Sequence, residues 1–206
     1  MREILNLGLK LLLITAVAGL ALGIVNAITR EPIKAQVEYM DAQSRIAVFS
    51  KDTEFVELNI DKIKSISSDY SIIAQVFQAR QNAQVIGYAI KTTPSGYGGA
   101  IELTVGISTD GTLTGIYIGN NSETPGLGAK ASEPEFRDQF KGKKVDKQLE
   151  VIKSGKLSDN QVQAISGATI TSKAVTSGVN TAMKLYNEVL SDDTKLQQLI
   201  VQGDAE

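Results

Sequence analysis

Four consecutive residues, Ser166-Gly167-Ala168-Thr169, place a hydroxyl on a glycine turn directly before an amphipathic segment. The first amide groups of a helix have no partner within the helix, and the helix dipole is positive at that end. A phosphate is therefore stabilised at such a terminus without a basic side chain. We expect Thr169 to be the hydroxyl at this site. From the residues alone, an ordinary capped turn that leads into a core helix remains the alternative.

The segment after this motif is predicted to be a helix from its spacing. Apolar residues recur at steps of three and four between Val175 and Leu190, with polar residues between them. Thr171 or Ser172 can cap this helix. The polar residues 191–206 are expected to fray.

Two glycine-rich loops precede the helix: Ser95-Gly96-Tyr97-Gly98-Gly99 and Glu123-Thr124-Pro125-Gly126-Leu127-Gly128. Pro125 and Gly126 fit the centre of a type II turn, which requires a positive φ at its second central residue. Glycines there let the backbone approach a flat ligand, on which Tyr97 can stack. The alternative is that both loops are plain connections.

The middle of the chain has the alternation and the turn residues of antiparallel hairpins. The predicted strands are 55–60, 71–78, 84–91, 101–107 and 113–118, with turns at 80–83 and 108–111. A helix is predicted over 33–49 with Pro32 in its first turn, and no element over 61–70. Strands followed by a C-terminal helix indicate an α+β fold.

Composition limits the chemistry that the chain can carry. Its 206 residues have 21 basic and 23 acidic side chains, which gives no electrostatic footprint for nucleic acid. The chain has no Cys and no His, which excludes disulfides, iron-sulfur clusters, zinc sites of the usual kind and Ser-His or Cys-His pairs. We expect no metal site and no catalytic side chain. Redox chemistry must come from a bound organic cofactor.

The N-terminus has the composition of a membrane anchor. The run from Leu11 to Ile28 is apolar except for Thr15 and Asn26, and as a helix it spans about 27 Å. The basic residues before it favour a cytoplasmic N-terminus and an extracytoplasmic main body. A cleaved signal peptide is the alternative, but the apolar run is longer than such peptides require. We predict an anchor over residues 1–30 and one domain over 31–206.

The three motifs, taken in order, resemble the FMN-binding domains of two membrane proteins: the G subunit of the Rnf electron-transport complex and the C subunit of the sodium-pumping NADH:quinone oxidoreductase. The resemblance covers nearly the whole chain, and the chain's length favours the Rnf protein. It implies an extracytoplasmic FMN-binding domain behind a single transmembrane helix, with FMN esterified through its phosphate to Thr169.

The resemblance also implies roles for the other motif residues. Ser166, Gly167 and Ala168 would shape the turn at the phosphate, and Thr171 and Ser172 would add hydrogen bonds near it. The expected ring environment is Glu123, Thr124, Leu127, Gly128, Tyr97 and Gly98. The family pattern has an acidic residue three positions before Ser166, where this chain has Gln163, with Asp159 four residues further back.

The function implied is electron relay within an ion-translocating ferredoxin:NAD oxidoreductase. The partners would be the other subunits of that complex, with a flavin transferase for maturation and no independent turnover for the isolated chain. Two alternatives stay open. One is an anchored flavoprotein relay outside any ion pump, and the other is a non-redox anchored binding or assembly module in which Thr169 is only a cap.

Overall fold

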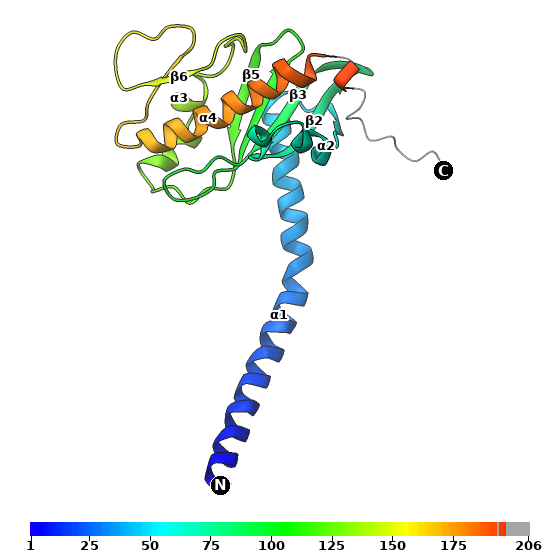
Figure 1. Ribbon diagram of the computed structural model, residues 1–206, viewed down its shortest axis with the longest axis vertical. Coiled ribbons are helices and arrows are strands. Elements are labelled where there is room, and N and C mark those ends of the chain that lie inside the picture. The colour runs from blue at the N-terminus through cyan, green and yellow to red at the C-terminus, as the bar shows by residue number, and fades with distance from the viewer. Residues whose placement is uncertain (193, 197–206) are drawn as a thin grey trace. The chain divides into compact units, whose positions relative to one another are not determined.

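The computed structural model describes residues 1–192 and 194–196 (Figure 1). The chain divides into two compact units, of which the first is Met1–Ala42 and the second begins at Gln43. Apart from Met1, the first unit lies within helix α1 (Arg2–Val48), which by length and composition is able to cross a membrane. The prediction of a separate helix over 33–49 with Pro32 in its first turn is wrong, because α1 is one helix that continues through this proline. The proline ring removes one backbone hydrogen bond, and the turns on either side continue the helix.

The second unit is built on a five-stranded antiparallel sheet with the order β1-β2-β3-β4-β5. Its strands are β1 (Glu54–Glu57), β2 (Ile73–Gln81), β3 (Gln84–Thr92), β4 (Leu103–Ser108) and β5 (Leu113–Ile118). Both predicted hairpins are confirmed. The first turn is shorter than predicted, since Arg80 and Gln81 still pair with β3 and only Asn82 and Ala83 form the turn. Both turn residues have the positive φ that two-residue hairpin turns favour.

A short helix, α2 (Ile60–Ile66), and a single 3-10 turn, η1 (Ser68–Tyr70), occupy the stretch for which no element was predicted. The side chain of Asn59 caps α2 by accepting a hydrogen bond from the amide of Lys62. Ile63 and Tyr70 are buried, so this polar stretch is fastened to the core by two apolar contacts.

Helix α4 (Thr169–Leu185) lies across one face of the sheet and continues as a π-helical turn, η3 (Tyr186–Leu190) (Figure 1). Alternate residues of the strands, such as Val76, Ile90 and Val105, form one buried core with the apolar face of α4. The helix begins earlier than the predicted caps, because Ala168 is the N-cap residue. Thr171 and Ser172 lie in the first turn and point their hydroxyls inward.

The opposite face of the sheet is covered by the last turns of α1. Val48 packs there with Phe77 and Ala89, which alternate along the strands with the residues of the main core. The Ser44 hydroxyl accepts a hydrogen bond from that of Thr104, at 3.0 Å. Residues 43–48 therefore belong to the same unit as the sheet.

The segment between β5 and α4 contains short elements that the sequence did not predict. They are η2 (Gly128–Ser132), α3 (Pro134–Arg137) and a parallel pair of strands, β6 (Glu150–Ile152) and β7 (Gln161–Gln163). Strand β7 leads directly into the Ser166–Thr169 turn. The expected fraying of residues 191–206 falls mainly outside the described residues.

Candidate functional site

A cavity of about 570 Å³ lies at the N-terminal end of α4. It brings together the two glycine-rich loops and the Ser166–Thr169 turn, which are far apart in the sequence. Its lining residues are Tyr97, Glu123, Thr124, Leu127, Gly128, Gly167, Ala168, Thr169, Ile170 and Thr171. Ile170 was not singled out from the sequence. Ser166 lines a neighbouring cavity of about 420 Å³. Gly98 and Ser172 do not line the 570 Å³ cavity but lie behind its wall, where Gly98 contacts Glu123 and Ser172 contacts Ile165.

The hydroxyls around the turn differ in what they contact. Thr171 is buried, and its hydroxyl donates to Oε2 of Glu123 at 2.5 Å. The Ser172 hydroxyl donates to the carbonyl of Ala168 at 2.9 Å and accepts from the amide of Ile165 at 3.0 Å. Thr169 is half-buried at the cavity, and among the described residues its hydroxyl has no hydrogen-bond partner. Of these three hydroxyls, that of Thr169 is the one that remains available to a ligand in the described part of the chain.

The backbone at the start of α4 leaves amides without partners inside the helix. Gly167 has a φ of 76°, and the first helical hydrogen bond runs from the amide of Ser172 to the carbonyl of Ala168. The amides of the residues between them belong to the first turn, where intrahelical acceptors do not exist. An anion beside Thr169 would therefore meet amide donors and the positive end of the helix dipole.

The loop at residues 123–128 has the turn that was predicted for it. Gly126 has a φ of 76°, and the amide of Leu127 donates to the carbonyl of Thr124 at 3.1 Å. The positive φ expected for a type II turn is confirmed. This turn places Leu127 at the cavity.

The rim of the cavity is apolar. Tyr97, Leu127 and Ile170 expose 71%, 44% and 57% of their surface, and outside α1 few other large apolar side chains of the described residues are as exposed. Among the lining residues named above, Glu123 is the only charged one. A largely apolar cavity with amide donors at one end suits a flat aromatic ligand that carries a phosphate.

Gln139 is a residue of the site region that the sequence analysis missed. Its side-chain carbonyl accepts from the amide of Gln163 at 2.7 Å, and its side-chain amide donates to the carbonyl of Gln163 at 3.3 Å. It thus holds the backbone of β7, which leads into the turn. The Gln163 side chain is exposed and lines the neighbouring cavity together with Glu133 and Glu135. No local pattern in the sequence signals a contact between residues 24 positions apart.

The cavity fits FMN on three counts. Its volume lies within the range of about 300–1,000 Å³ that is usual for small-ligand sites. Amides and an available hydroxyl stand at one end, where a phosphate would be held. An exposed aromatic and two aliphatic side chains stand at the rim, where a planar ring would lie.

The FMN-binding domain family matches residues 96–184, a range that contains every lining residue of the cavity. The fold and the site therefore define an FMN-binding domain. The G subunit of the Na(+)-translocating ferredoxin:NAD(+) oxidoreductase complex of Acetobacterium woodii is 40% identical to this chain, covering 91% of the chain and 94% of the relative. The chain belongs to the family of the Rnf complex G subunits.

Two further comparisons agree with this assignment. The G subunit of the proton-translocating ferredoxin:NAD(+) oxidoreductase complex of Clostridium ljungdahlii is 38% identical, covering 82% of this chain and 83% of the relative. The crystal structure of NqrC from Shewanella oneidensis resembles the chain with a TM-score of 0.50 over 74% of this chain and 86% of that one. At 20% identity, this last likeness concerns the fold alone.

Proposed function

We propose that this chain is a membrane-anchored flavoprotein that relays electrons within an ion-translocating ferredoxin:NAD oxidoreductase complex and carries FMN esterified to Thr169. The relatives named above are subunits of such complexes. The observation that carries the proposal is the hydroxyl of Thr169, which has no partner among the described residues and faces a cavity at the N-terminus of α4.

The attachment step replaces a phosphoanhydride bond of the donor by a phosphoester bond, and the hydroxyl proton of Thr169 passes to the released phosphate or to solvent. The oxygen Oγ1 of Thr169 forms a bond to the phosphorus of FMN, and the hydroxyl proton is lost. Because a free phosphate monoester is a poor donor in water, we propose a flavin dinucleotide as the donor, whose phosphoanhydride bond breaks and releases a nucleoside monophosphate. A flavin transferase would catalyse this step, since the cavity offers no general base within the described residues that contacts Thr169.

The residues of the chain hold and orient the cofactor. The amides of the first turn of α4 would bind the phosphate, and Gly167 gives the turn its shape. Tyr97, Leu127 and Ile170 would cover the ring from the rim. Bound flavin supplies the capacity to accept one or two electrons. Because the proposed role is relay between partners, the isolated chain is expected to show no turnover of its own.

The proposed location of the domain gives a reason for a covalent bond to FMN. Residues 1–30 would anchor the chain with its N-terminus in the cytoplasm, and residues 31–206 would form the extracytoplasmic domain. Outside the cytoplasm, a loosely bound FMN would be lost by diffusion. An ester to Thr169 prevents that loss.

The test is the intact mass of the full chain, purified after coexpression with a flavin transferase. We expect one FMN per chain, located at Thr169 by peptide fragmentation, and none in Thr169→Val. Thr181→Val is the matched control, because its exposed hydroxyl lies in the same helix and bonds only the carbonyl of Ser177. Flavin that persists in Thr169→Val, or a wild-type chain without any adduct, would refute the attachment.

A further inference from the structure

The carboxylate of Glu123 lies where the three segments of the cavity meet. Its side chain is buried, with the whole residue only 7% exposed. Oε1 accepts a hydrogen bond from the amide of Gly98 at 2.9 Å, and Oε2 accepts one from the hydroxyl of Thr171 at 2.5 Å. One side chain therefore fastens the first glycine-rich loop and helix α4 to the second glycine-rich loop.

Two glycines leave the space that this carboxylate occupies. A Cβ atom at Gly96 would lie 2.3 Å from Oε1, and one at Gly128 would lie 2.2 Å from Oε2 and 2.7 Å from the hydroxyl oxygen of Thr171. No real Cβ tolerates such distances, so any side chain at either position displaces the carboxylate. The backbone thus forms a cradle around the charged end of Glu123.

The charge of Glu123 has no cationic partner. Both of its donors are neutral, and no lysine or arginine forms an ion pair with it in the described part of the chain. Burying a charge without an ion pair is costly. A glutamine would make the same two contacts without that cost, since its carbonyl accepts from Gly98 and its amide donates to Thr171. Joining the loops therefore explains the length of the side chain and leaves its charge unexplained.

We propose that Glu123 is the positioning residue of the proposed flavin cavity, and that its charge, which has no ion-pair partner among the described residues, lowers the reduction potential of the bound FMN. This inference rests on the proposed function. The shape of the cavity would depend on the two hydrogen bonds, whereas the potential would depend on the charge, because a buried negative charge opposes the addition of further negative charge nearby.

The experiment uses the full chain with Glu123→Gln, Glu123→Ala and the exposed control Glu150→Gln. Spectroelectrochemical titration of the flavin-loaded proteins measures the potential, and visible circular dichroism reports how the ring is held. For Glu123→Gln we expect an unchanged dichroism spectrum and about a tenfold higher ratio of reduced to oxidised flavin at a fixed potential. That ratio corresponds to about 30 mV for a two-electron couple. Glu150→Gln should shift neither quantity.

Glu123→Ala should alter the dichroism spectrum of the flavin while the far-ultraviolet spectrum keeps the native fold. Hydrogen exchange in the flavin-free Thr169→Val background adds a measurement that needs no cofactor. There, adding Glu123→Ala should make the amide of Gly98 exchange at least about tenfold faster, because its buried acceptor is gone. Adding Glu123→Gln instead should keep this amide protected.

Each result decides one part. Unchanged exchange and dichroism in Glu123→Ala would overturn the positioning role, and an unchanged potential in Glu123→Gln would overturn the role of the charge. If the wild-type chain takes up no flavin while exchange at Gly98 still depends on the side chain at position 123, the proposed function fails and the positioning role survives.

Discussion

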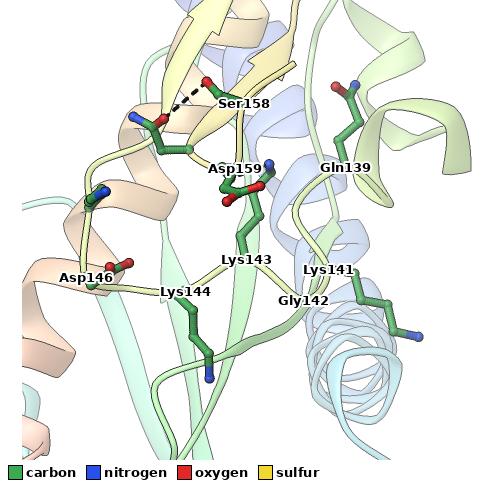
Figure 2. Close-up of a pocket in the computed structure, with 10 residues that line it drawn as sticks. Gln139, Lys141, Gly142, Lys143, Lys144, Asp146, Ser158 and Asp159 are labelled. Atoms are coloured by element: carbon green, nitrogen blue, oxygen red, sulfur yellow. Dashed lines mark hydrogen bonds between the residues drawn. The ribbon is translucent and has the colours of Figure 1, made fainter. Parts of the chain in front are cut away.

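Two cavities of nearly equal volume differ in the groups that could attract an anion. The proposed flavin cavity, which is the one at the N-terminal end of α4 with a volume of about 570 Å³, has amides, hydroxyls and one acid. The other, of about 540 Å³, is rich in lysine, and we call it the lysine cavity (Figure 2). It is lined by Gln139, Lys141, Gly142, Lys143, Lys144, Asp146, Lys147, Ser158, Asp159 and Asn160. By charge alone, an anion would be assigned to the lysine cavity.

The lysines do not converge on a common point. Figure 2 shows Lys141 and Lys144 pointing in different directions. Lys143 donates to the carbonyl of Asp159 at 2.7 Å, and burial lowers the pKa of its ammonium. Lys144 forms an ion pair with Asp110 at 3.0 Å. Lys143 and Lys144 are thus already engaged by groups of the protein itself. The amides at the start of α4, by contrast, are fixed in direction by the helix. If the phosphate of FMN is held at the start of α4, as we propose, the fixed direction of the amides outweighs the number of positive charges in the lysine cavity.

The largest effect is expected from Gly98→Ala, because Gly98 donates its amide hydrogen bond to Glu123 behind the cavity wall. A Cβ there would lie 2.0 Å from the carbonyl oxygen of Ser122, which is backbone and cannot rotate away. We expect a loss of about 1–3 kcal/mol in the free energy of unfolding and little or no flavin attachment. Denaturant titration and intact mass measure these two quantities. Gly119→Ala is the control, because its Cβ would come no closer than 3.3 Å to Glu102. Wild-type stability and wild-type flavin attachment in Gly98→Ala would contradict the close contact between Gly98 and Ser122.

Ser172→Ala tests the hydroxyl that holds the turn. It removes the acceptor of the Ile165 amide and leaves this donor without its partner, which costs about 1–3 kcal/mol when the group is buried. We expect lower stability and slower flavin attachment, measured as the fraction modified against time. Ser177→Ala, exposed in the same helix, should change neither quantity. Attachment at the wild-type rate would mean that the turn keeps its shape without this hydrogen bond.

Gln139→Ala tests the contact between the wall of the lysine cavity and strand β7. Gln139 lines the lysine cavity, yet its side-chain amide group forms hydrogen bonds with the backbone of Gln163. Gln163 precedes the turn at residues 166–169. Because the contact is exposed, we expect a cost of about 0.5–1.5 kcal/mol and a modest slowing of attachment, both measured as for Ser172→Ala. Gln148→Ala is the exposed control. Equal rates of flavin attachment in the two variants would show that Gln139 does not support the turn at residues 166–169.

The difference between local and distant contacts explains what the sequence predicted of this site. The turn at Gly126, the hairpin at Asp110-Gly111 and the helix after Thr169 depend on residues within a few positions, so their residue types predict them. The Glu123 contact with Thr171 spans 48 positions, and no local pattern encodes it.

The same reason applies to the start of α4. From the sequence, Thr171 and Ser172 were equally good caps. Their hydroxyls instead bond to Glu123 and to the turn at residues 165–168, which only the folded chain brings near them. Strands β6 and β7, with three residues each, are too short for alternation to be recognised.

A smaller effect, confined to acid, is expected from Asp110→Asn beside the lysine cavity. Hydrogen bonds from the hydroxyl of Ser108, from Thr112 and from Lys144 lower the pKa of Asp110. A carboxyl whose pKa is depressed by folding adds stability above its unfolded pKa of about 4, and this stability is lost as the pH falls through the folded value. Between about pH 4 and pH 2 the wild type should therefore lose stability more steeply than Asp110→Asn in denaturant titrations. Parallel pH profiles would show that this carboxyl is not stabilised by folding.

The smallest effect is expected from replacing both Lys141 and Lys147 by Gln. Both side chains are exposed, and exposed charges are screened within about 10 Å at ordinary ionic strength. If the phosphate is held by amides of α4, removing two positive charges from the lysine cavity should leave the fraction of chains with flavin and the flavin potential unchanged. A fall in attachment with purified transferase, greater at low salt, would show that the lysine cavity takes part in maturation by attracting an anionic donor or an acidic partner. The two cavities would then serve two steps of the same process. The lysine cavity would help to deliver the flavin donor, and the cavity at α4 would retain the flavin, so the lysine cavity would no longer be an ordinary surface.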